Sequence, residues 1–237
     1  MQLVPVIDLL RGQVVRGIQG HRESYRPIVS ALCSTAEPLA VARILCEHCG
    51  SGVLYVADLD ALQGAPAQTA LLAGLLDALP WLTLWLDAGF VDAEAAAALL
   101  AALEPAAAAR VLPVFASESL RSSAALAACF TDPAWPALLS LDRRDGQRLD
   151  PADCWERPEL WPERVIVMTL ERVGAGSGPD LDTLRAVAAS APPRTRLIGA
   201  GGIRNEADLR EAEAAGADAW LVASALHDLR LSPRRGG

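Results

Sequence analysis

Acidic residues recur along the chain directly after short apolar runs, where several of them could share one site. Asp8 and Asp142 each end such a run, and Asp58 lies in the same kind of position. Carboxylates that share an apolar site can have their pKa values pushed apart, so that one acts as an acid and the other as a base. For any one of them the alternative is a helix cap or an arginine partner. We take Asp8, Asp142 and Asp58 as the candidate catalytic residues.

A glycine-rich segment supplies the strongest local signal for ligand binding. The apolar run Leu197–Ala200 passes into Gly201 and Gly202 and then into a helix start at Asn205. Glycine lets backbone N–H groups converge on an anion, and the following helix adds a partial positive charge. A plain tight turn is the alternative. This pattern favours a site for a phosphate group.

A second segment is expected to complete this phosphate site. Ala223 and Ser224 follow the last apolar run, and their small side chains keep the backbone accessible. Gly176, in the glycine-rich stretch Val173–Gly178, is the remaining candidate. The loops after the last two strands of a (β/α)₈ barrel commonly bind phosphate. Together these residues predict one pocket for a phosphorylated small molecule.

The segment Arg16–Pro27 is long, polar and rich in arginine. Long loops without secondary structure in compact domains are usually functional. We interpret this one as a mobile substrate lid in which Arg22 and Arg26 meet an anionic group. A solvated charged loop is the alternative. His48 and His227 are expected to be structural.

The cysteines do not predict a metal or a disulfide framework. Cys46 and Cys49 have the spacing of zinc ligands, but no second pair follows, and the end of a helix explains them. Five cysteines in a chain of this length favour reduced thiols. Because lysine is absent, a Schiff-base lysine is excluded. We expect no metal, flavin or nucleotide cofactor.

Charge and hydropathy exclude several classes of protein. The 237 residues are 52% hydrophobic, which is enough for a large core, and they carry a net charge of −8. That charge and the lack of a basic stripe argue against a nucleic-acid partner. No apolar stretch is long enough to span a membrane, and the chain begins in a strand rather than a charged leader. We therefore expect a cytoplasmic protein; the sequence carries no signal for an oligomeric state.

Eight apolar runs alternate with helical patterns over the whole chain. They do not alternate with polar residues, which is typical of parallel strands buried on both faces. Eightfold strand–helix alternation predicts a closed (β/α)₈ TIM barrel of the ribulose-phosphate-binding type, with residues 1–237 forming a single domain. The expected strands are Leu3–Ile7, Gly52–Ala57, Leu82–Leu86, Arg110–Phe115, Ala137–Leu141, Arg164–Met168, Arg196–Ala200 and Ala219–Val222.

A weak internal repeat indicates two half-barrels. Ile7–Gln13 resembles Leu141–Gln147, because in each an Asp is followed four residues later by Gly-Gln. Asp87–Phe90 likewise corresponds to Ala200–Ile203. Active sites of such barrels lie at the carboxyl ends of the strands, so the polar residues there are the ones to consider. Besides the candidate catalytic residues, these are Asp60, Asp87, Ser117 and Thr169.

Five segments, in order along the chain, resemble the isomerase/cyclase family of histidine biosynthesis. The family comprises the phosphoribosylformimino-aminoimidazole carboxamide ribotide isomerase and the cyclase subunit of imidazole glycerol phosphate synthase. The resemblance implies the same barrel, a phosphate site at the last two strands, and acid/base catalysis by two aspartates. The segments are Val4–Leu9, Asp58–Ala61, Ser140–Asp142, Ala200–Ile203 and Val222–Ala225.

The chain departs from the family pattern at two places. Asp8 matches the first catalytic aspartate and Thr169 matches a strand-end threonine that would orient substrate, but the second acidic position falls on Val173 or Gly174. The isomerases also carry three glycines where this chain has Asp87-Ala88-Gly89. Asp87 would oppose a phosphate there and contact another part of the substrate. The resemblance therefore implies a ligand with one phosphate.

Three interpretations of the function remain open. The first is an enzyme that moves protons on a mono-phosphorylated small molecule, with Asp8 as base and Asp142, Asp58 or Asp87 as the second carboxylate. Gly20–Pro27 and Tyr55–Ala61 resemble a divergent branch of methanogens and methylotrophs, which implies a role in making a methanopterin-type one-carbon cofactor. The second is the genuine histidine-pathway isomerase, and the third is a non-catalytic phosphate-binding or scaffold subunit.

Overall fold

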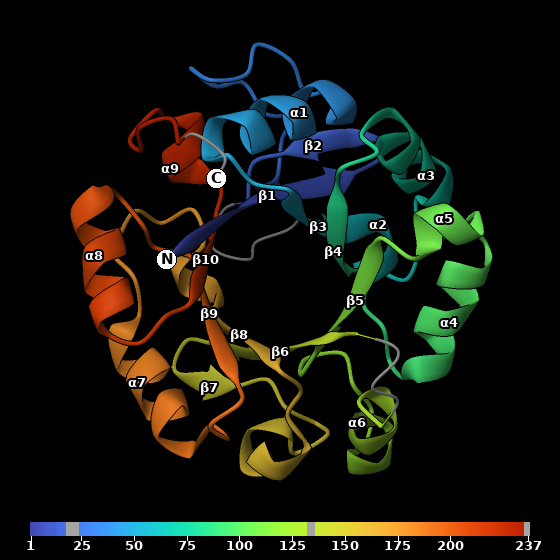
Figure 1. Cartoon of the computed structure of the whole chain (residues 1–237), viewed down its shortest axis with the longest axis vertical. Coiled ribbons are helices and arrows are strands. Elements are labelled where there is room, and N and C mark those ends of the chain that lie inside the picture. Colours follow the sequence, from blue (N-terminus) through green and yellow to red (C-terminus); the bar gives the residue numbers. More distant parts are fainter. Residues whose placement is uncertain (18–23, 132–135, 235–237) are drawn as a thin grey trace.

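A computed structural model describes residues 1–17, 24–131 and 136–234 and shows a closed ring of strands surrounded by helices (Figure 1). The eight strands of the ring pair in parallel, and β10 pairs with β1 to close it. This confirms the (β/α)₈ barrel. The ring consists of β1 (Gln2–Leu10), β3 (Val53–Asp58), β4 (Thr83–Asp87), β5 (Val111–Ala116), β6 (Leu138–Arg144), β8 (Arg164–Thr169), β9 (Arg196–Ala200) and β10 (Ala219–Val222).

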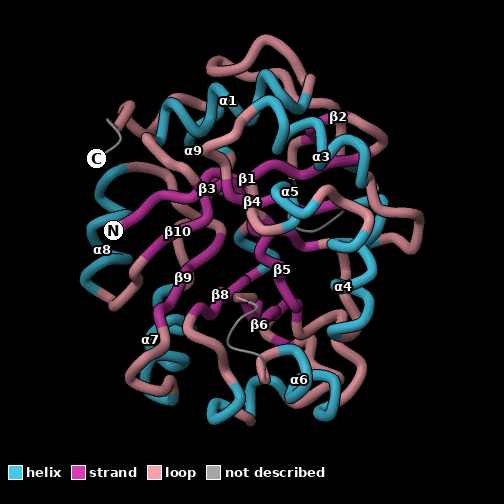
Figure 2. Tube along the Cα trace, turned by 45° about the vertical axis from the view of Figure 1, so that its right-hand side comes forward, coloured by secondary structure: helices cyan, strands magenta, loops and turns pink. Residues whose placement is uncertain are grey.

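Helices cover the outside of the ring (Figure 2). Asp92 and Asn205 cap α4 and α8 by accepting backbone N–H bonds, as their positions predict. The helix Ser123–Cys129 is capped by Ser122, whose hydroxyl accepts the Ala125 backbone N–H. The α-helices are α1 (Pro38–Cys49), α2 (Leu59–Leu62), α3 (Thr69–Ala78), α4 (Ala93–Ala101), α5 (Pro105–Ala108), α6 (Ser123–Cys129), α7 (Leu181–Ser190), α8 (Glu206–Ala214) and α9 (Ser224–His227).

Short 3₁₀ turns occupy the irregular parts of the chain. The polar stretch after the fifth barrel strand contains η2 (Cys154–Glu156) and η3 (Pro158–Leu160). A third turn, η4 (Leu170–Arg172), follows β8. Within the described ranges, no helix combines the length and the apolar character that crossing a membrane would need.

Two short strands outside the ring show that the two half-barrels share backbone structure as well as the sequence repeat. β2 (Gln13–Val15) folds back antiparallel on β1, and β7 (Gln147–Arg148) folds back on β6. Both hairpins turn through a residue with φ 51° followed by glycine with φ 77°. Positive φ at both central residues gives the turn type that suits the twist of paired strands. The two Asp–Gly-Gln segments thus form equivalent structures.

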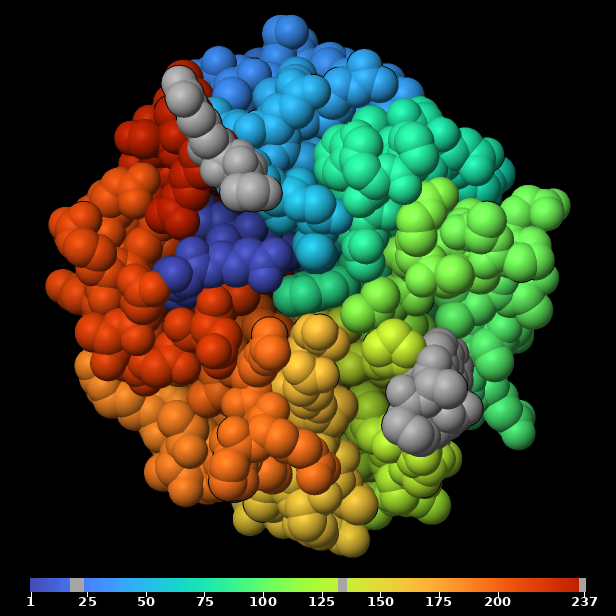
Figure 3. Space-filling model, in the orientation of Figure 1, coloured from blue at the N-terminus to red at the C-terminus, as the bar shows by residue number. Residues whose placement is uncertain are grey.

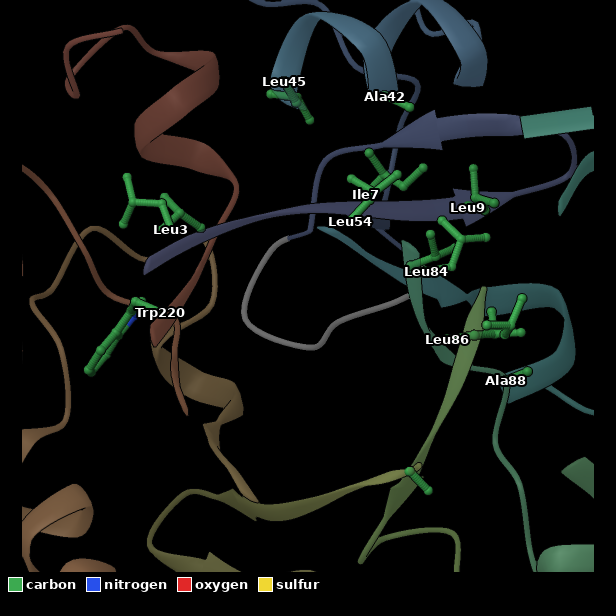
Figure 4. Close-up of a cluster of buried hydrophobic side chains, with 14 of the residues drawn as sticks. Leu3, Ile7, Leu9, Ala42, Leu45, Leu54, Leu84, Leu86, Ala88 and Trp220 are labelled. Atoms are coloured by element: carbon green, nitrogen blue, oxygen red, sulfur yellow. The ribbon is translucent and has the colours of Figure 1, made fainter. Parts of the chain in front are cut away.

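Alternation along each strand divides the buried side chains into two layers. On β1, Leu3, Ile7 and Leu9 belong to the outer layer, between the strands and the helices. Figure 4 shows Ile7 on the side of β1 that faces α1. Val4 belongs to the inner layer inside the ring. Successive side chains of a strand point to opposite faces. Once the layer of one residue is known, the layers of its neighbours along the strand are therefore known too.

The last two strands of the ring make a tight contact with each other. In Figure 3 the first residues of the chain, in blue, lie against the orange and red segments near its end. Gly199 of β9 is paired in register with Trp220 of β10, whose ring is almost fully buried. A Cβ atom at Gly199 would lie 2.2 Å from Cζ3 of that ring. Only glycine leaves room for the indole here.

We predict that Gly199→Ala lowers the free energy of unfolding by about 1–3 kcal/mol, because an added methyl group overpacks the contact with Trp220. Urea denaturation measures the change. The matched control is Gly74→Ala in α3, where nothing lies within 4 Å of the new Cβ and a small stabilisation is expected. Equal stability of Gly199→Ala and the unmutated chain would contradict the assigned contact.

Candidate active site

A cavity of about 510 Å³ opens at the carboxyl ends of the strands. That volume lies within the range of small-molecule sites, and the position is where active sites of such barrels lie. Three of the carboxylates that line it come from barrel strands, namely Asp8 from β1, Asp87 from β4 and Asp142 from β6. Each belongs to the inward-pointing set of its strand, as do Val6 and Tyr55, which lie beside them. The strand ends therefore bring together acids that are far apart in the sequence.

Asp142 is buried at the end of β6 and is held by three hydrogen bonds. Its Oδ1 accepts from the Ser140 hydroxyl at 2.7 Å, and its Oδ2 accepts from the Ser117 hydroxyl and the Glu118 backbone N–H, both at 3.2 Å. Burial, followed by the nearby carboxylate of Glu118, raises the pKa of Asp142 from 3.8 to about 8. At neutral pH this carboxyl group keeps its proton and can serve as an acid.

Tyr55 and Asp87 form a hydrogen-bonded pair next to Asp142. The Tyr55 hydroxyl donates to Asp87 Oδ2 at 3.2 Å, and the Gly89 backbone N–H donates to Oδ1 at 3.1 Å. Burial raises the pKa of Tyr55 well above its ordinary value, and the charges of Asp87, Asp142 and Asp8 add to the shift. The phenol therefore stays protonated, and the pair adds negative charge to the first-half end of the cavity.

Asp8 lies where the loop after β2 meets the loop after η4. A Cβ atom at Gly17 would lie 2.6 Å from Asp8 Oδ2 and 3.5 Å from both the Tyr25 hydroxyl and Val173 Cγ1. Gly17 thus packs between the carboxylate of the first half-barrel and Val173 of the second. Val173 is one of the two positions on which the second acid of the family pattern falls; it lies on the same side of the cavity as Asp8, and its side chain is apolar.

The proposed phosphate-binding residues meet at one corner of the cavity. Gly176, Gly201, Gly202, Ala223 and Ser224 all line it. All three glycines have positive φ, from 59° to 81°. A Cβ at position 202 would lie 2.2 Å from the Gly178 carbonyl oxygen, so this close approach requires glycine. The corner is thus built from main chain with few side chains in the way.

Two of the sequence candidates do not face the cavity. Asp58 is fully buried on the outward side of β3, where its carboxylate caps α2 and accepts the backbone and side-chain amide N–H groups of Gln68. Thr169 points outward from β8 and donates to Asp180 Oδ2 at 2.9 Å, whereas Met168 lines the cavity. Both follow from strand alternation. The structure gives Asp58 and Thr169 roles in joining strands to helices.

The lid loop is described only at its two ends. Arg22 lies outside the described residues. The Arg26 guanidinium donates to the Tyr25 carbonyl at 2.8 Å, and Arg26 is not among the residues that line the cavity. The loop leaves and returns as a paired stem, because Arg16 N–H donates to Arg26 O and Ile28 N–H donates to Val14 O.

His227 and the cysteines have structural surroundings. His227 lines the cavity, its Nδ1 lies 3.1 Å from the Ser30 hydroxyl, and burial lowers its pKa to about 4. His48 Nε2 lies 2.9 Å from the Leu231 carbonyl oxygen. Cys46 and Cys49 are buried free thiols. In residues 1–17, 24–131 and 136–234 no three His, Cys, Asp or Glu side chains are grouped so that they could hold a metal ion.

Sequence reasoning missed three residues that line the cavity: Tyr55, Glu118 and Arg230. Tyr55 could have been found by counting alternate residues along its strand, because it is the inward neighbour of Ala57. Glu118 directly follows the strand-end residue Ser117, so extending the search by one residue would have found it. Arg230 lies beyond the short helix α9, and no periodic pattern in the sequence indicates where its side chain goes.

The closed barrel and its cavity define a (β/α)₈ protein with a cavity of small-molecule size at the carboxyl ends of its strands. A family model described as "Histidine biosynthesis protein" matches residues 2–232, and the chain belongs to this family.

Two relatives show how the similarity is distributed. A 1-(5-phosphoribosyl)-5-((5-phosphoribosylamino)methylideneamino) imidazole-4-carboxamide isomerase of Halobacterium salinarum is 27% identical over 238 residues, covering 95% of this chain and 91% of that protein. An uncharacterized protein of Methanocaldococcus jannaschii is 38% identical over 64 residues. That match covers 27% of this chain and 28% of the relative's length.

We predict that Asp142→Asn becomes more stable relative to the unmutated chain as the pH rises from about 4 to about 8. Below pH 3.8 the carboxyl group is protonated in both folded and unfolded states. Between 3.8 and about 8 only the unfolded state loses the proton, so the unmutated chain loses up to about 1.4 kcal/mol per pH unit. Above that interval the difference stays constant.

Urea denaturation across this pH range, with the exposed Asp77→Asn as a charge-matched control, measures the effect. A pH-independent difference between Asp142→Asn and the unmutated chain would show that the Asp142 pKa is not raised.

Proposed function

We propose that the chain is an enzyme that moves protons on a small molecule carrying one phosphate group. The observation that carries the proposal is the pairing of two unlike carboxyl sites in one cavity. Asp142 keeps its proton at neutral pH, and Asp8 lines the same cavity from the equivalent strand of the other half-barrel. An acid and a base on either side of a substrate allow one proton to be removed while another is supplied.

In this scheme Asp8 is the base and Asp142 is the acid. The reaction is an isomerisation, an enolisation or a lyase step, in which Asp8 takes a proton from one substrate atom and Asp142 gives one to another. Tyr55 donates to Asp87 at 3.2 Å and so holds this neighbouring carboxylate in place. Because Asp142 is buried and accepts three hydrogen bonds, its position is fixed before the substrate arrives.

The phosphate group is proposed to bind at the corner formed by Gly201, Gly202, Ala223 and Ser224, with Gly176 opposite. Supporting this are the glycine conformations, which no other residue type adopts easily, and membership of a family with a phosphorylated-substrate isomerase among the relatives. At the other end, the Asp87 carboxylate would repel a second phosphate. The cavity is therefore suited to a ligand with a single phosphate.

We further propose that the reaction belongs to the synthesis of a methanopterin-type one-carbon cofactor. The support is the resemblance of Gly20–Pro27 and Tyr55–Ala61 to the branch of methanogens and methylotrophs. The partial match to the Methanocaldococcus jannaschii protein agrees with it. Mass spectrometry of small molecules that co-purify with the protein tests this: a phosphorylated pterin or pterin precursor is expected, and a histidine-pathway ribotide would contradict it.

We predict that Ser224→Asp weakens the binding of inorganic phosphate by about tenfold or more, because a carboxylate in the corner repels the anion. Isothermal titration calorimetry measures the dissociation constant. Ser190→Asp, which places the same charge on the exposed end of α7, should bind like the unmutated chain. If both variants bind phosphate equally well, the anion does not bind at this corner.

The second candidate function is the histidine-pathway isomerase itself, which the relative from Halobacterium favours because it matches nearly the whole chain. Against it stands Val173, which supplies no carboxylate where the family carries its second acid. The decisive substitution is therefore Val173→Asp.

We predict that the unmutated chain fails to complement a strain lacking this isomerase, and that Val173→Asp raises isomerase turnover by about 10²-fold or more, since it restores the missing acid or base. Val173→Asn is the matched control and should leave turnover low. Full complementation by the unmutated chain, at confirmed expression, would establish the isomerase and overturn the first proposal.

A further inference from the structure

Arg230 reaches the phosphate corner from outside the glycine segments. Its side chain lines the cavity, and its Nη1 lies 4.0 Å from where a Cβ would stand on Gly176. Among the lining residues that the structure describes, the basic side chains other than histidine are Arg16 and Arg230. The two guanidinium groups differ in the hydrogen bonds that they make within the protein, and this difference decides which of them is available to a ligand.

Arg16 forms an ion pair with Asp228. Its Nη2 donates to Asp228 Oδ1 at 2.8 Å, a normal charge-assisted hydrogen bond. Arg230 is only loosely associated with the same carboxylate, because its Nη2 lies 3.8 Å from Asp228 Oδ2, beyond hydrogen-bond distance. Within the described part of the chain, no hydrogen bond from the Arg230 guanidinium is found, and its side chain is about half exposed. Its donors remain available for an anion.

An unusual turn sets the direction of Arg230. After α9 the chain passes through Leu229 with φ 53°, and the N–H groups of Leu229 and Arg230 donate back to Leu226 O and Ala225 O. This is the Schellman arrangement, whose left-handed position glycine normally occupies. Leucine there is strained, and it is half exposed, so burial of its side chain does not explain it. The turn directs the chain back so that Arg230 lies beside Gly176.

We propose that Arg230 is a ligand-binding residue that donates its guanidinium N–H groups to the phosphate held at the Gly201–Gly202 corner. This inference rests on the proposed phosphate site and adds a side chain to it. A guanidinium presents paired donors that match two phosphate oxygens, whereas the main-chain amides supply the rest of the shell. Asp228 keeps Arg230 close to the corner without consuming its donors, because Arg16 occupies that carboxylate.

The test is phosphate binding by the full chain. Titration calorimetry with inorganic phosphate should show that Arg230→Gln binds about tenfold more weakly, since hydrogen bonds to a charged group are lost. Arg230→Lys keeps the charge without the paired donors and should fall between the two. The matched control Arg210→Gln, on the exposed surface of α8, should bind like the unmutated chain. Thermal melting without phosphate checks that all variants fold.

The outcomes separate this inference from the proposed function. If the unmutated chain binds phosphate and Arg230→Gln binds it equally well, Arg230 is not a ligand-binding residue, while the phosphate corner stands. If the unmutated chain binds no phosphate, the proposed site and this inference both fall. If Arg210→Gln weakens binding as much as Arg230→Gln, the effect is one of net charge and the inference is wrong.

Discussion

The alternation of side chains along the barrel strands decides what this protein can do. Successive residues of a strand point to opposite faces, so each strand end offers one residue to the cavity and the next to the helices. On β1, β4 and β6 the inward residue at the strand end is an aspartate; on β3 it is alanine, and on β8 methionine. The chemistry of the cavity therefore depends on which alternate residues of each strand point inward. If the register of β1 or β4 shifted by one residue, an apolar side chain would take the place of the aspartate.

The same alternation explains how the acids are tolerated. Asp58 points outward, where N–H groups of α2 and Gln68 satisfy it, so it stabilises the connection between a strand and its helix. Asp87 and Asp142 point inward, where hydroxyl and backbone N–H groups donate hydrogen bonds to them. Neutral donors orient a buried carboxylate without neutralising it, and this leaves the proton of Asp142 available for chemistry.

The proposed phosphate corner and the Gly199–Trp220 contact lie on the same two strands. Gly199 admits the Trp220 ring between β9 and β10, and the Trp220 Nε1 in turn donates to the Gly201 carbonyl at 3.1 Å. The contact between these two strands therefore also positions the glycine turn at the proposed phosphate corner. The acidic end of the cavity belongs to the first half-barrel and β6, so the two ends of a ligand meet opposite electrostatic environments.

The sequence by itself determined the barrel, its eight strands, the equivalence of the two Asp–Gly-Gln hairpins and the family, because these depend on local patterns of apolar residues, glycine and short motifs. It also identified Asp8, Asp142 and the glycine corner as candidates. Only the tertiary structure decided which strand-end residues face the cavity, removing Asp58 and Thr169 and adding Tyr55 and Arg230. Strand register and the path of a turn depend on contacts between distant segments, and no local pattern contains that information.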